Sequence, residues 1–384
     1  MKTLKGYVFR MYPDEKQKYL INKTIGCTRF VYNHFLSEKI IDYKETKKSK
    51  TAYDQMKELK NLQVEYPFLK EVDSCSLRNS IFSLEDAYQR FYNKQTGYPK
   101  FKKKDTSNSY KTNNIKNTYK DNHYESIKLN MKEKTIILPK LKEVKIRGYR
   151  NKENIVGDIK SAVIRKEAGK YYVSVLIEEP LILPTFIPKS IIGIDLGIKD
   201  LIVTSNNEKI ENSIKAKNIK KRIKGLQKAL SRCEKGSKNR YKIKIKLQRC
   251  YQKLRNMRKH LIHTITNKLI KDNDIIVTED LSVKNMYQNK HVARLLVDTS
   301  LSEIIRVLKY KAKWKNKKII QINRYYPSSQ ICNICDYQNK KVKDLSIRKW
   351  ECPKCHRIHE RDYNAAINIM WEGLKIYMKG IEQG

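Results

Sequence analysis

Apolar side chains recur at every second position from Tyr7 to Met11, which predicts a short strand with one buried face. Residues 12–15, Tyr-Pro-Asp-Glu, are typical of a helix start, because proline fits the first turn and acids favour the positive end of the helix dipole. Apolar residues at helical spacing continue to about residue 95. Gly26 predicts a break between the first two helices.

Short β-type runs bounded by turn residues follow between residues 135 and 177, and residues 168–170, Ala-Gly-Lys, predict a hairpin. We expect a small β domain that the opening strand joins. Residues 99–125 are rich in Lys, Asn, Ser and Thr with spaced aromatics. This composition suits nucleic-acid binding and also suits a solvated loop, and both interpretations stay open. A stiff linker is predicted at Pro180, Pro184 and Pro188.

From Ile191 the pattern becomes α/β. Two long basic helices are predicted with a break near Gly236. The second carries a seam of apolar residues at steps of three and four, namely Ile243, Leu247, Cys250, Leu254, Met257, Leu261 and Ile265. The other predicted elements are strands at 191–196, 201–204, 274–278 and 318–322 and a helix at 299–315.

Composition narrows the classes of protein. A chain of 384 residues with 40% apolar residues predicts two or three folded domains. Lys and Arg number 83 against 40 Asp and Glu, a net charge of +43 that favours a polyanionic partner, nucleic acid. No secretory signal or membrane-spanning run is present, and no basic helix carries the wide apolar face that membrane binding needs. Scattered cysteines outside two paired motifs predict a reducing, cytoplasmic location.

Two Cys-x-x-Cys pairs, separated by 16 residues, predict a zinc ribbon. Four thiolates complete a tetrahedral Zn²⁺ site, so the metal is expected to be structural, and His356 and His359 are not needed as ligands. Few large apolar residues surround the pairs, so the segment needs its metal to fold. The predicted zinc ligands are Cys332, Cys335, Cys352 and Cys355.

Three acids stand where a metal site can form. Asp195 lies in a predicted strand between Gly193 and Gly197, which leave space for a cation, although pairing with a lysine beside a tight turn explains it too. Glu279 ends an apolar strand and Asp362 begins an apolar helix, and either can be an ordinary polar terminus. In a basic protein with a zinc ribbon, the three together fit a nuclease that holds two Mg²⁺.

The motifs around these acids resemble those of the TnpB family, RNA-guided nucleases of insertion sequences related to type V CRISPR effectors. The resembling segments are residues 194–199 (Ile-Asp-Leu-Gly-Ile-Lys), 279–281 (Glu-Asp-Leu) and 361–366 (Arg-Asp-Tyr-Asn-Ala-Ala), together with 9–13, 29–33, 97–101 and 325–330. Two residues depart from the family pattern: Glu360 stands where Asp is common, and His356 where Gly often follows the last cysteine.

The resemblance implies a multidomain α+β protein with an RNase H-like (RuvC) nuclease domain, an inserted zinc ribbon, a β-barrel-like wedge domain and recognition helices. It assigns residues 1–11 and 98–187 to the wedge domain, 12–97 to the recognition helices, 188–325 and 360–384 to the nuclease domain, and 326–359 to the ribbon. It further implies a guide RNA from the transposon end, double-stranded target DNA beside a short motif, and cleavage through Asp195, Glu279 and Asp362. By the same resemblance we expect that no protein partner is required, that the host is bacterial or archaeal, and that the protein lies on the nucleoid when bound to DNA.

Two other functions stay open: a nuclease-inactive RNA-guided repressor and a protein-guided transposase or resolvase. All three acids are kept, which disfavours the repressor. Candidate contacts to the short DNA motif lie on one helix, since Asn can pair with adenine edges, and a solvated helix face is the alternative there. The candidate nucleic-acid-binding residues are Ser76, Asn79, Ser80, Ser83, Lys100, Lys102, Lys103 and Tyr110.

Overall fold

The computed structural model describes residues 2–382, apart from residues 105, 120–121, 149–154, 182, 184–185, 198–199, 212–215, 281–299 and 345. The chain divides into two compact units, residues 1–181 and 182–384. The boundary falls in the segment of the predicted proline linker, of which Pro184 lies outside the described residues.

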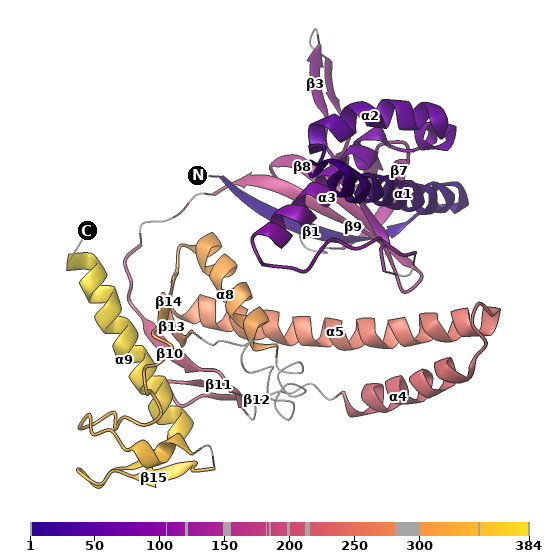
Figure 1. The fold of residues 1–384 in the computed structure, drawn as a ribbon. Helices are drawn as coiled ribbons and strands as arrows, with labels where there is room; N and C mark the ends of the chain where they lie inside the picture. Colours follow the sequence, from indigo (N-terminus) through magenta and orange to yellow (C-terminus); the bar gives the residue numbers. More distant parts are fainter. Residues whose placement is uncertain are drawn as a thin grey trace. The chain divides into compact units, whose positions relative to one another are not determined.

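A seven-stranded antiparallel sheet forms the core of the first unit (Figure 1). Strand β1 lies in its middle, paired with β9 along most of its length and with β7 at its end. Alternation explains the placement, because Tyr7, Phe9 and Met11 are buried while Val8 is 40% exposed. In sheet order the strands are β2 (Ser109–Asn113), β8 (Asp158–Glu167), β9 (Lys170–Pro180), β1 (Lys2–Tyr12), β7 (Lys142–Arg147), β6 (Thr135–Leu138) and β5 (Lys128–Asn130).

The α-helices among the described residues of this unit are α1 (Glu15–Thr46), α2 (Ala52–Glu65) and α3 (Ser74–Tyr92). The predicted break at Gly26 is wrong, because α1 runs through it without interruption. A mid-helix glycine costs only about 1 kcal/mol. Buried neighbours on both sides, Ile25, Cys27 and Val31, hold the helix in the two cores of the unit.

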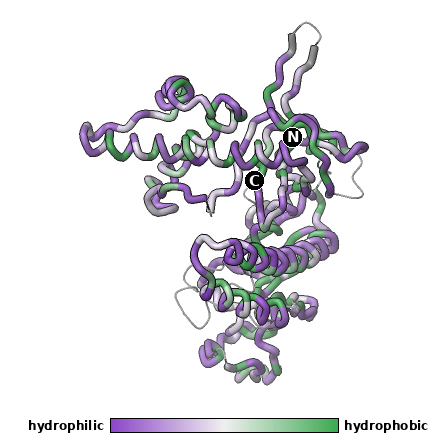
Figure 2. The backbone as a smooth tube through the Cα atoms, turned by 90° about the vertical axis from the view of Figure 1, so that its right-hand side faces the viewer, coloured by the Kyte–Doolittle hydropathy of each residue, from purple (hydrophilic) through white to green (hydrophobic). Residues whose placement is uncertain are grey.

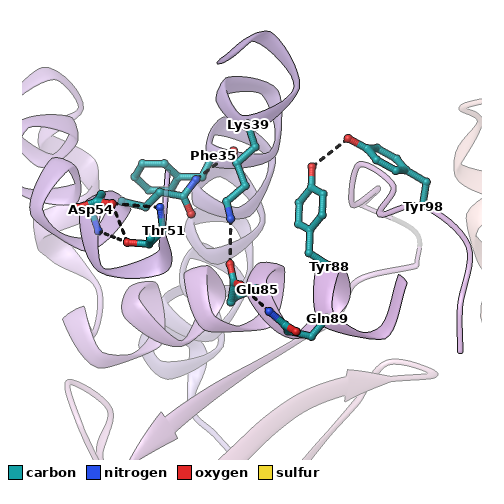
Figure 3. A network of polar contacts seen from close by, with 9 residues as sticks. Phe35, Lys39, Thr51, Asp54, Glu85, Tyr88, Gln89 and Tyr98 are labelled. Atoms are coloured by element: carbon teal, nitrogen blue, oxygen red, sulfur yellow. Dashed lines mark hydrogen bonds and ion pairs between the residues drawn. The ribbon is translucent and has the colours of Figure 1, made fainter. Parts of the chain in front are cut away.

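A polar network ties α1 to α3 (Figure 3). Lys39 of α1 is 6% exposed, and its Nζ donates to Glu85 Oε2 of α3 at 2.9 Å. The ammonium also lies 5.1 Å from the ring centroid of Tyr88, whose hydroxyl is 3.0 Å from that of Tyr98. Desolvation acts to raise the pKa of Glu85, but hydrogen bonds from Lys39 and Gln89 hold it below its ordinary value.

A five-stranded sheet forms the core of the second unit, in the order β12–β11–β10–β13–β14. Strands β10, β13 and β14 are parallel, and β11 and β12 are antiparallel to their neighbours. This mixed sheet with helices on both faces fits the expected RNase H-like (RuvC) fold. The bounds are β10 (Ile191–Asp195), β11 (Asp200–Thr204), β12 (Lys209–Glu211), β13 (Ile275–Glu279) and β14 (Lys318–Ile322).

Helices cover the two faces of this sheet differently (Figure 1). The C-terminal part of α5 (Lys238–Asp272) and α8 (Leu301–Lys315) pack on one face, against Ile192 and Ile194. Helix α9 (Arg361–Glu382) packs on the other, where Ile369 meets Ile275 and Val277. The tube in Figure 2 shows hydrophobic residues in short stretches between longer hydrophilic ones, as buried faces of amphipathic elements produce.

The predicted apolar seam of α5 serves two partners. Leu247, Cys250 and Leu254 pack against α4 (Lys217–Arg232), whereas Leu261 and Ile265 join the core under the sheet. One continuous seam therefore fixes the basic α4–α5 hairpin to the core of the second unit. None of the described helices combines the length and apolar character that crossing a bilayer requires.

Replacing Glu85 with Gln is expected to destabilise the first unit by about 1–3 kcal/mol, because it leaves the buried Lys39 ammonium without a countercharge. The double variant Lys39→Met/Glu85→Gln should recover most of the loss, because no charge is then left buried. Urea unfolding followed through the residue 1–181 transition measures both. A double variant no more stable than Glu85→Gln would contradict this account.

Asp274 gives a pH-dependent prediction for the second unit. Its Oδ2 accepts from the backbone N–H groups of Lys189 and Ser190 at 2.8 and 3.2 Å, and its Oδ1 contacts Lys317 Nζ. Hydrogen bonds from Lys317 and Lys189 lower the pKa of Asp274 to about 2. Because the folded-state pKa is depressed, this stabilisation is present above about pH 4 and is lost as the pH falls toward 2.

Asp274→Asn should therefore lower the stability of the second unit by about 1–3 kcal/mol at pH 7. The difference from the unmodified chain should shrink between pH 4 and pH 2. Calorimetry over this range measures it, with Asp272→Asn as the control that removes the same charge two residues away. An Asp274→Asn deficit that stays constant down to pH 2 would disprove the assignment.

Candidate active site and metal centre

The three predicted acids come from adjacent elements of the second unit. Asp195 is the last residue of β10 and Glu279 the last of β13. These strands are parallel neighbours, so both carboxylates stand at the same edge of the sheet. Asp362 is in the first turn of α9, which packs against β10. The topology thus brings all three acids, which are far apart in sequence, to one region of the fold.

Glycine is needed on both sides of Asp195 for a reason other than the expected space for a cation. A Cβ on Gly193 would lie 2.1 Å from Ala366 O and 2.7 Å from Met370 N, so α9 already fills the space beside this glycine. A Cβ on Gly197 would lie 2.6 Å from Asp200 O. The prediction that these glycines leave room for a cation is therefore wrong for the space beside them. They permit close backbone packing that positions the acids.

The carboxylates of Glu279 and Asp362 raise the pKa of Asp195. Desolvation, together with the negative charges of Glu279 and Asp362, raises the pKa of Asp195 to about 8, against the opposing effect of Arg361. Desolvation also raises the pKa of Glu279, although Ser328 donates a hydrogen bond to its Oε1. A group of acids that repel each other's charge is a site that a divalent cation would stabilise.

Basic side chains contact the acids at the start of α9. Arg348 Nη1 donates to Asp362 Oδ2 at 3.3 Å. Glu360, at the position where the family pattern has Asp, pairs with Lys209 Nζ of β12 at 2.5 Å. The sequence also allowed Asp195 to pair with a lysine. Among the described residues no lysine is found in contact with Asp195, and the positive group that acts on this carboxylate is Arg361.

The four predicted zinc cysteines form one cluster. Their sulfurs all lie within 4.8 Å of one another, and in the described part of the chain no other group of three or more His, Cys, Asp or Glu ligand atoms is so close. Cys332 and Cys355 are 3.6 Å apart and Cys335 and Cys352 3.5 Å. Tetrahedral Zn²⁺ with bonds of about 2.3 Å requires sulfurs about 3.8 Å apart, so the donor set fits zinc.

The ribbon around this cluster explains one departure from the family pattern. Each Cys-x-x-Cys turn ends in a left-handed residue, Asp336 at φ 58° and His356 at φ 57°. Glycine adopts this conformation at little cost, which accounts for its preference at the position of His356. Two short antiparallel strands, β15 (Lys349–Glu351) and β16 (Ile358–Glu360), carry the second half of the ribbon into α9.

Two asparagines of α9 were missed as positioning residues. Asn364 Nδ2 donates to Ile331 O at 2.7 Å and Asn364 Oδ1 accepts from Asn333 N at 3.1 Å. Asn368 Nδ2 donates to Ile331 O and to Ser328 O at 2.7 and 2.8 Å. Both amides are buried. The signal in the sequence was two Asn four residues apart on an apolar helix face, since buried amides require partners.

Four of the eight candidate nucleic-acid contacts of the first unit are buried. Ser76, Asn79 and Ser80 of α3 are 1, 8 and 5% exposed, and Asn79 Nδ2 donates to Cys75 O and Lys111 O. The interpretation of these three as an open helix face is wrong, because that face packs on β2. Ser83 is exposed, as are Lys100 and Lys103.

The expected exposure of Tyr110 is also wrong. It is 7% exposed in the core of the sheet, so its ring is not free to stack on a base. Residues 99–125, for which nucleic-acid binding and a solvated loop stayed open, include β2 and, in their second half, the hairpin of β3 (Lys116–Tyr119) with β4 (Asn122–Glu125).

A polar pocket of about 270 Å³ nevertheless joins most of these residues. Its lining includes Ser76, Asn79, Ser80, Ser83, Lys102 and Tyr110, but neither Lys100 nor Lys103. Lys102 Nζ lies 3.7 Å from the ring centroid of Tyr32, and burial lowers the pKa of Lys102 to about 8. A half-buried cation beside hydroxyl and amide groups can bind an anionic or polar ligand.

Comparison with known proteins agrees with the motifs. Residues 172–290 match the OrfB_IS605 family described as probable transposase, and residues 302–369 the TNB domain described as Cas12f1-like. Residues 1–48 match a helix-turn-helix domain of the same OrfB_IS605 type, although here they form strand β1 and the single helix α1.

A Streptomyces pristinaespiralis protein named as an RNA-guided DNA endonuclease is 30% identical over 380 residues, 96% of this chain and 89% of that protein. Escherichia coli InsQ, which is also named as an RNA-guided DNA endonuclease, is 28% identical over 97% of this chain and 93% of that protein. The fold resembles that of a Cas12f1–sgRNA–target DNA complex, with a TM-score of 0.58 and 13% identity over 96% of this chain and 99% of that one. The chain belongs to the TnpB-like family.

Proposed function

We propose that this chain is an RNA-guided DNA endonuclease of an insertion sequence, cutting target DNA at Asp195, Glu279 and Asp362. The observation that carries the proposal is the convergence of these three acids at one edge of the second sheet, in a chain of this family. Desolvation and the negative charges of Glu279 and Asp362 make ionised Asp195 unfavourable without a cation. Two bound Mg²⁺ would supply an activated water and stabilisation of the leaving oxygen.

Some of the site residues are proposed to bind metal ions, and others to position the residues that bind them. Asp195, Glu279 and Asp362 are proposed to bind the metal ions, and Ser328 orients the Glu279 carboxylate through its hydrogen bond. Arg348, paired with Asp362, keeps positive charge beside the site. Zinc at Cys332, Cys335, Cys352 and Cys355 is proposed as the structural ion that holds the start of α9 in place.

The charge of the chain supports nucleic acid as its partner. A net charge of +43 matches the many phosphates of a guide RNA and its heteroduplex with DNA, which a protein can hold through the backbone without reading bases. We propose a guide RNA encoded at the transposon end. The first unit is proposed to supply the recognition helices (12–97) and all but the last residues of the wedge domain (1–11 and 98–187), and the second the nuclease domain (188–325 and 360–384) with its ribbon (326–359).

A transposase without RNA is the second candidate, because the matching family is described as a probable transposase. The two functions differ in their need for RNA. RNase treatment during purification should abolish cutting by a guided nuclease and leave a protein-guided transposase active on transposon ends.

Asp195→Ala is expected to abolish cleavage of a matched DNA target, a loss of at least about 10³-fold, since it removes a proposed metal ligand. Binding of guide RNA and target should persist, because Asp195 adds no favourable contact to phosphates. Gel assays of cleavage and binding with Mg²⁺ measure both. Asp200→Ala, a nearby acid at the start of β11, is the control and should still cut. Full cutting by Asp195→Ala would refute the site.

DNA contacts of the first unit can be separated by chemistry. Lys103→Ala should weaken DNA binding equally for all sequences and reduce the salt slope by about 1, because an exposed lysine meets phosphate. Ser83→Ala should instead change the preference for bases beside the target, because a hydroxyl at the pocket mouth can contact a base edge. Binding to DNA with randomised flanks at several salt concentrations distinguishes them, with Lys60→Ala on α2 as the charge control. An unchanged base preference in Ser83→Ala would exclude that residue.

A further inference from the structure

A histidine outside the sulfur cluster contacts one of its cysteines. His359 of β16 is 6% exposed, and its Nε2 lies 3.1 Å from Cys332 Sγ. Its ring lies 4.8 Å from the ring of Trp350, the residue opposite it on β15. Two neighbours thus fix the imidazole, the indole on one side and the thiol at its edge.

The geometry distinguishes a hydrogen-bond donor from a metal ligand. The four sulfurs form a compact set, and His359 is not part of it. The separations of 3.5 and 3.6 Å within pairs of sulfurs are near those of a closed tetrahedron, which has no position for a fifth donor. A thiolate bound to zinc keeps lone pairs that accept hydrogen bonds, and such bonds orient the ligand and tune metal affinity.

The same residue connects the cluster to the candidate active site. His359 is followed by Glu360, which pairs with Lys209 of β12, and by Arg361, whose Nη1 donates to Asp344 O at 2.9 Å. Asp362 comes next, in the first turn of α9. Three successive side chains therefore fasten β16 to the sulfur cluster, to the sheet and to the ribbon loop directly before the acid.

We propose that His359 is a positioning residue that donates its Nε2–H to the zinc-bound Cys332 thiolate and so couples the metal cluster to the strand that delivers Asp362. This inference rests on zinc in the ribbon, which is part of the proposed function. It predicts that zinc affinity and Asp362 placement change together when the donor is lost.

Three variants of the full chain test the donor. His359→Phe keeps a ring against Trp350 but has no N–H, and His359→Gln keeps an N–H donor without the aromatic ring. His356→Phe is the matched control, because His356 lies in the same ribbon, is exposed, and contacts Glu351 Oε1 at 2.9 Å instead of a sulfur. Zinc transfer to a competing chelator measures affinity, and the sulfur-to-metal charge-transfer band of the cobalt-substituted chain reports on the thiolates.

His359→Phe should bind zinc about 10–100-fold more weakly, with a shifted charge-transfer band and slower DNA cutting. His359→Gln should recover part of the affinity, and His356→Phe should stay within about twofold of the unmodified chain, because it removes no contact to a sulfur. Zinc affinity of His359→Phe within that range would overturn the inference. A cobalt spectrum showing one ligand fewer in His359→Phe would overturn it too, since His359 would then be a ligand.

The affinity readout separates this inference from the proposed function. A chain whose zinc affinity depends on His359 but that never cuts guided targets would refute the nuclease and keep the coupling of His359 to zinc. A chain that cuts while its zinc affinity ignores residue 359 would refute only the His359 inference. Absence of bound zinc in the unmodified chain would overturn both the ribbon assignment and the inference.

Discussion

Helix α9 lies against strand β10 at a distance that permits no side chain at residue 193. A Cβ there would overlap Ala366 O, and a Cβ on Gly373 of the helix would lie 2.3 Å from Val277 Cγ1 of the next strand. Ala365 and Ala366, both buried, keep the helix surface thin where the approach is closest. Small residues on both elements let the backbones pack closely, and this contact places the first turn of α9 at the edge where β10 and β13 end.

The electrostatic consequence of this packing is a cluster that opposes its own ionisation. Asp195 is desolvated and faces two further negative groups, so its proton is held up to about pH 8 in the metal-free protein. Folding must therefore supply the free energy that brings the acids together, and the apolar contacts of α9 and of α5 with α8 are where the second unit obtains it. A bound divalent cation would recover that free energy, which makes metal binding and the packing of α9 linked properties.

Local sequence patterns predicted the helices and strands well, but not which of these elements pack against one another. Alternation at Tyr7 to Met11 and the apolar seam of α5 were sufficient to predict a strand and a helix, since each depends on a periodicity within one segment. The burial of Ser76, Asn79 and Tyr110 was not predictable, because it depends on β2 packing against α3, a contact between residues more than twenty positions apart. The prediction that Gly193 leaves space for a cation failed for the same reason. Alternation showed that one face of the strand lacked side chains, but not that a helix from residue 361 onward would cover it.

The start of α9 is fixed by two independent kinds of interaction, and each supplies what the other lacks. Packing on β10 and β13 holds the helix against the sheet, but the hydrophobic effect is non-directional and does not by itself define a position along the helix axis. Hydrogen bonds have a defined length and direction, and those from Asn364 and Asn368 to Ile331 and Ser328 set the position of the helix along that axis. Ser328 also contacts Glu279, so one short segment before Cys332 touches both the helix that carries Asp362 and the acid on β13. The distance between Glu279 and Asp362 thus depends on the conformation of residues 328–333, which the cysteine cluster holds at its other end.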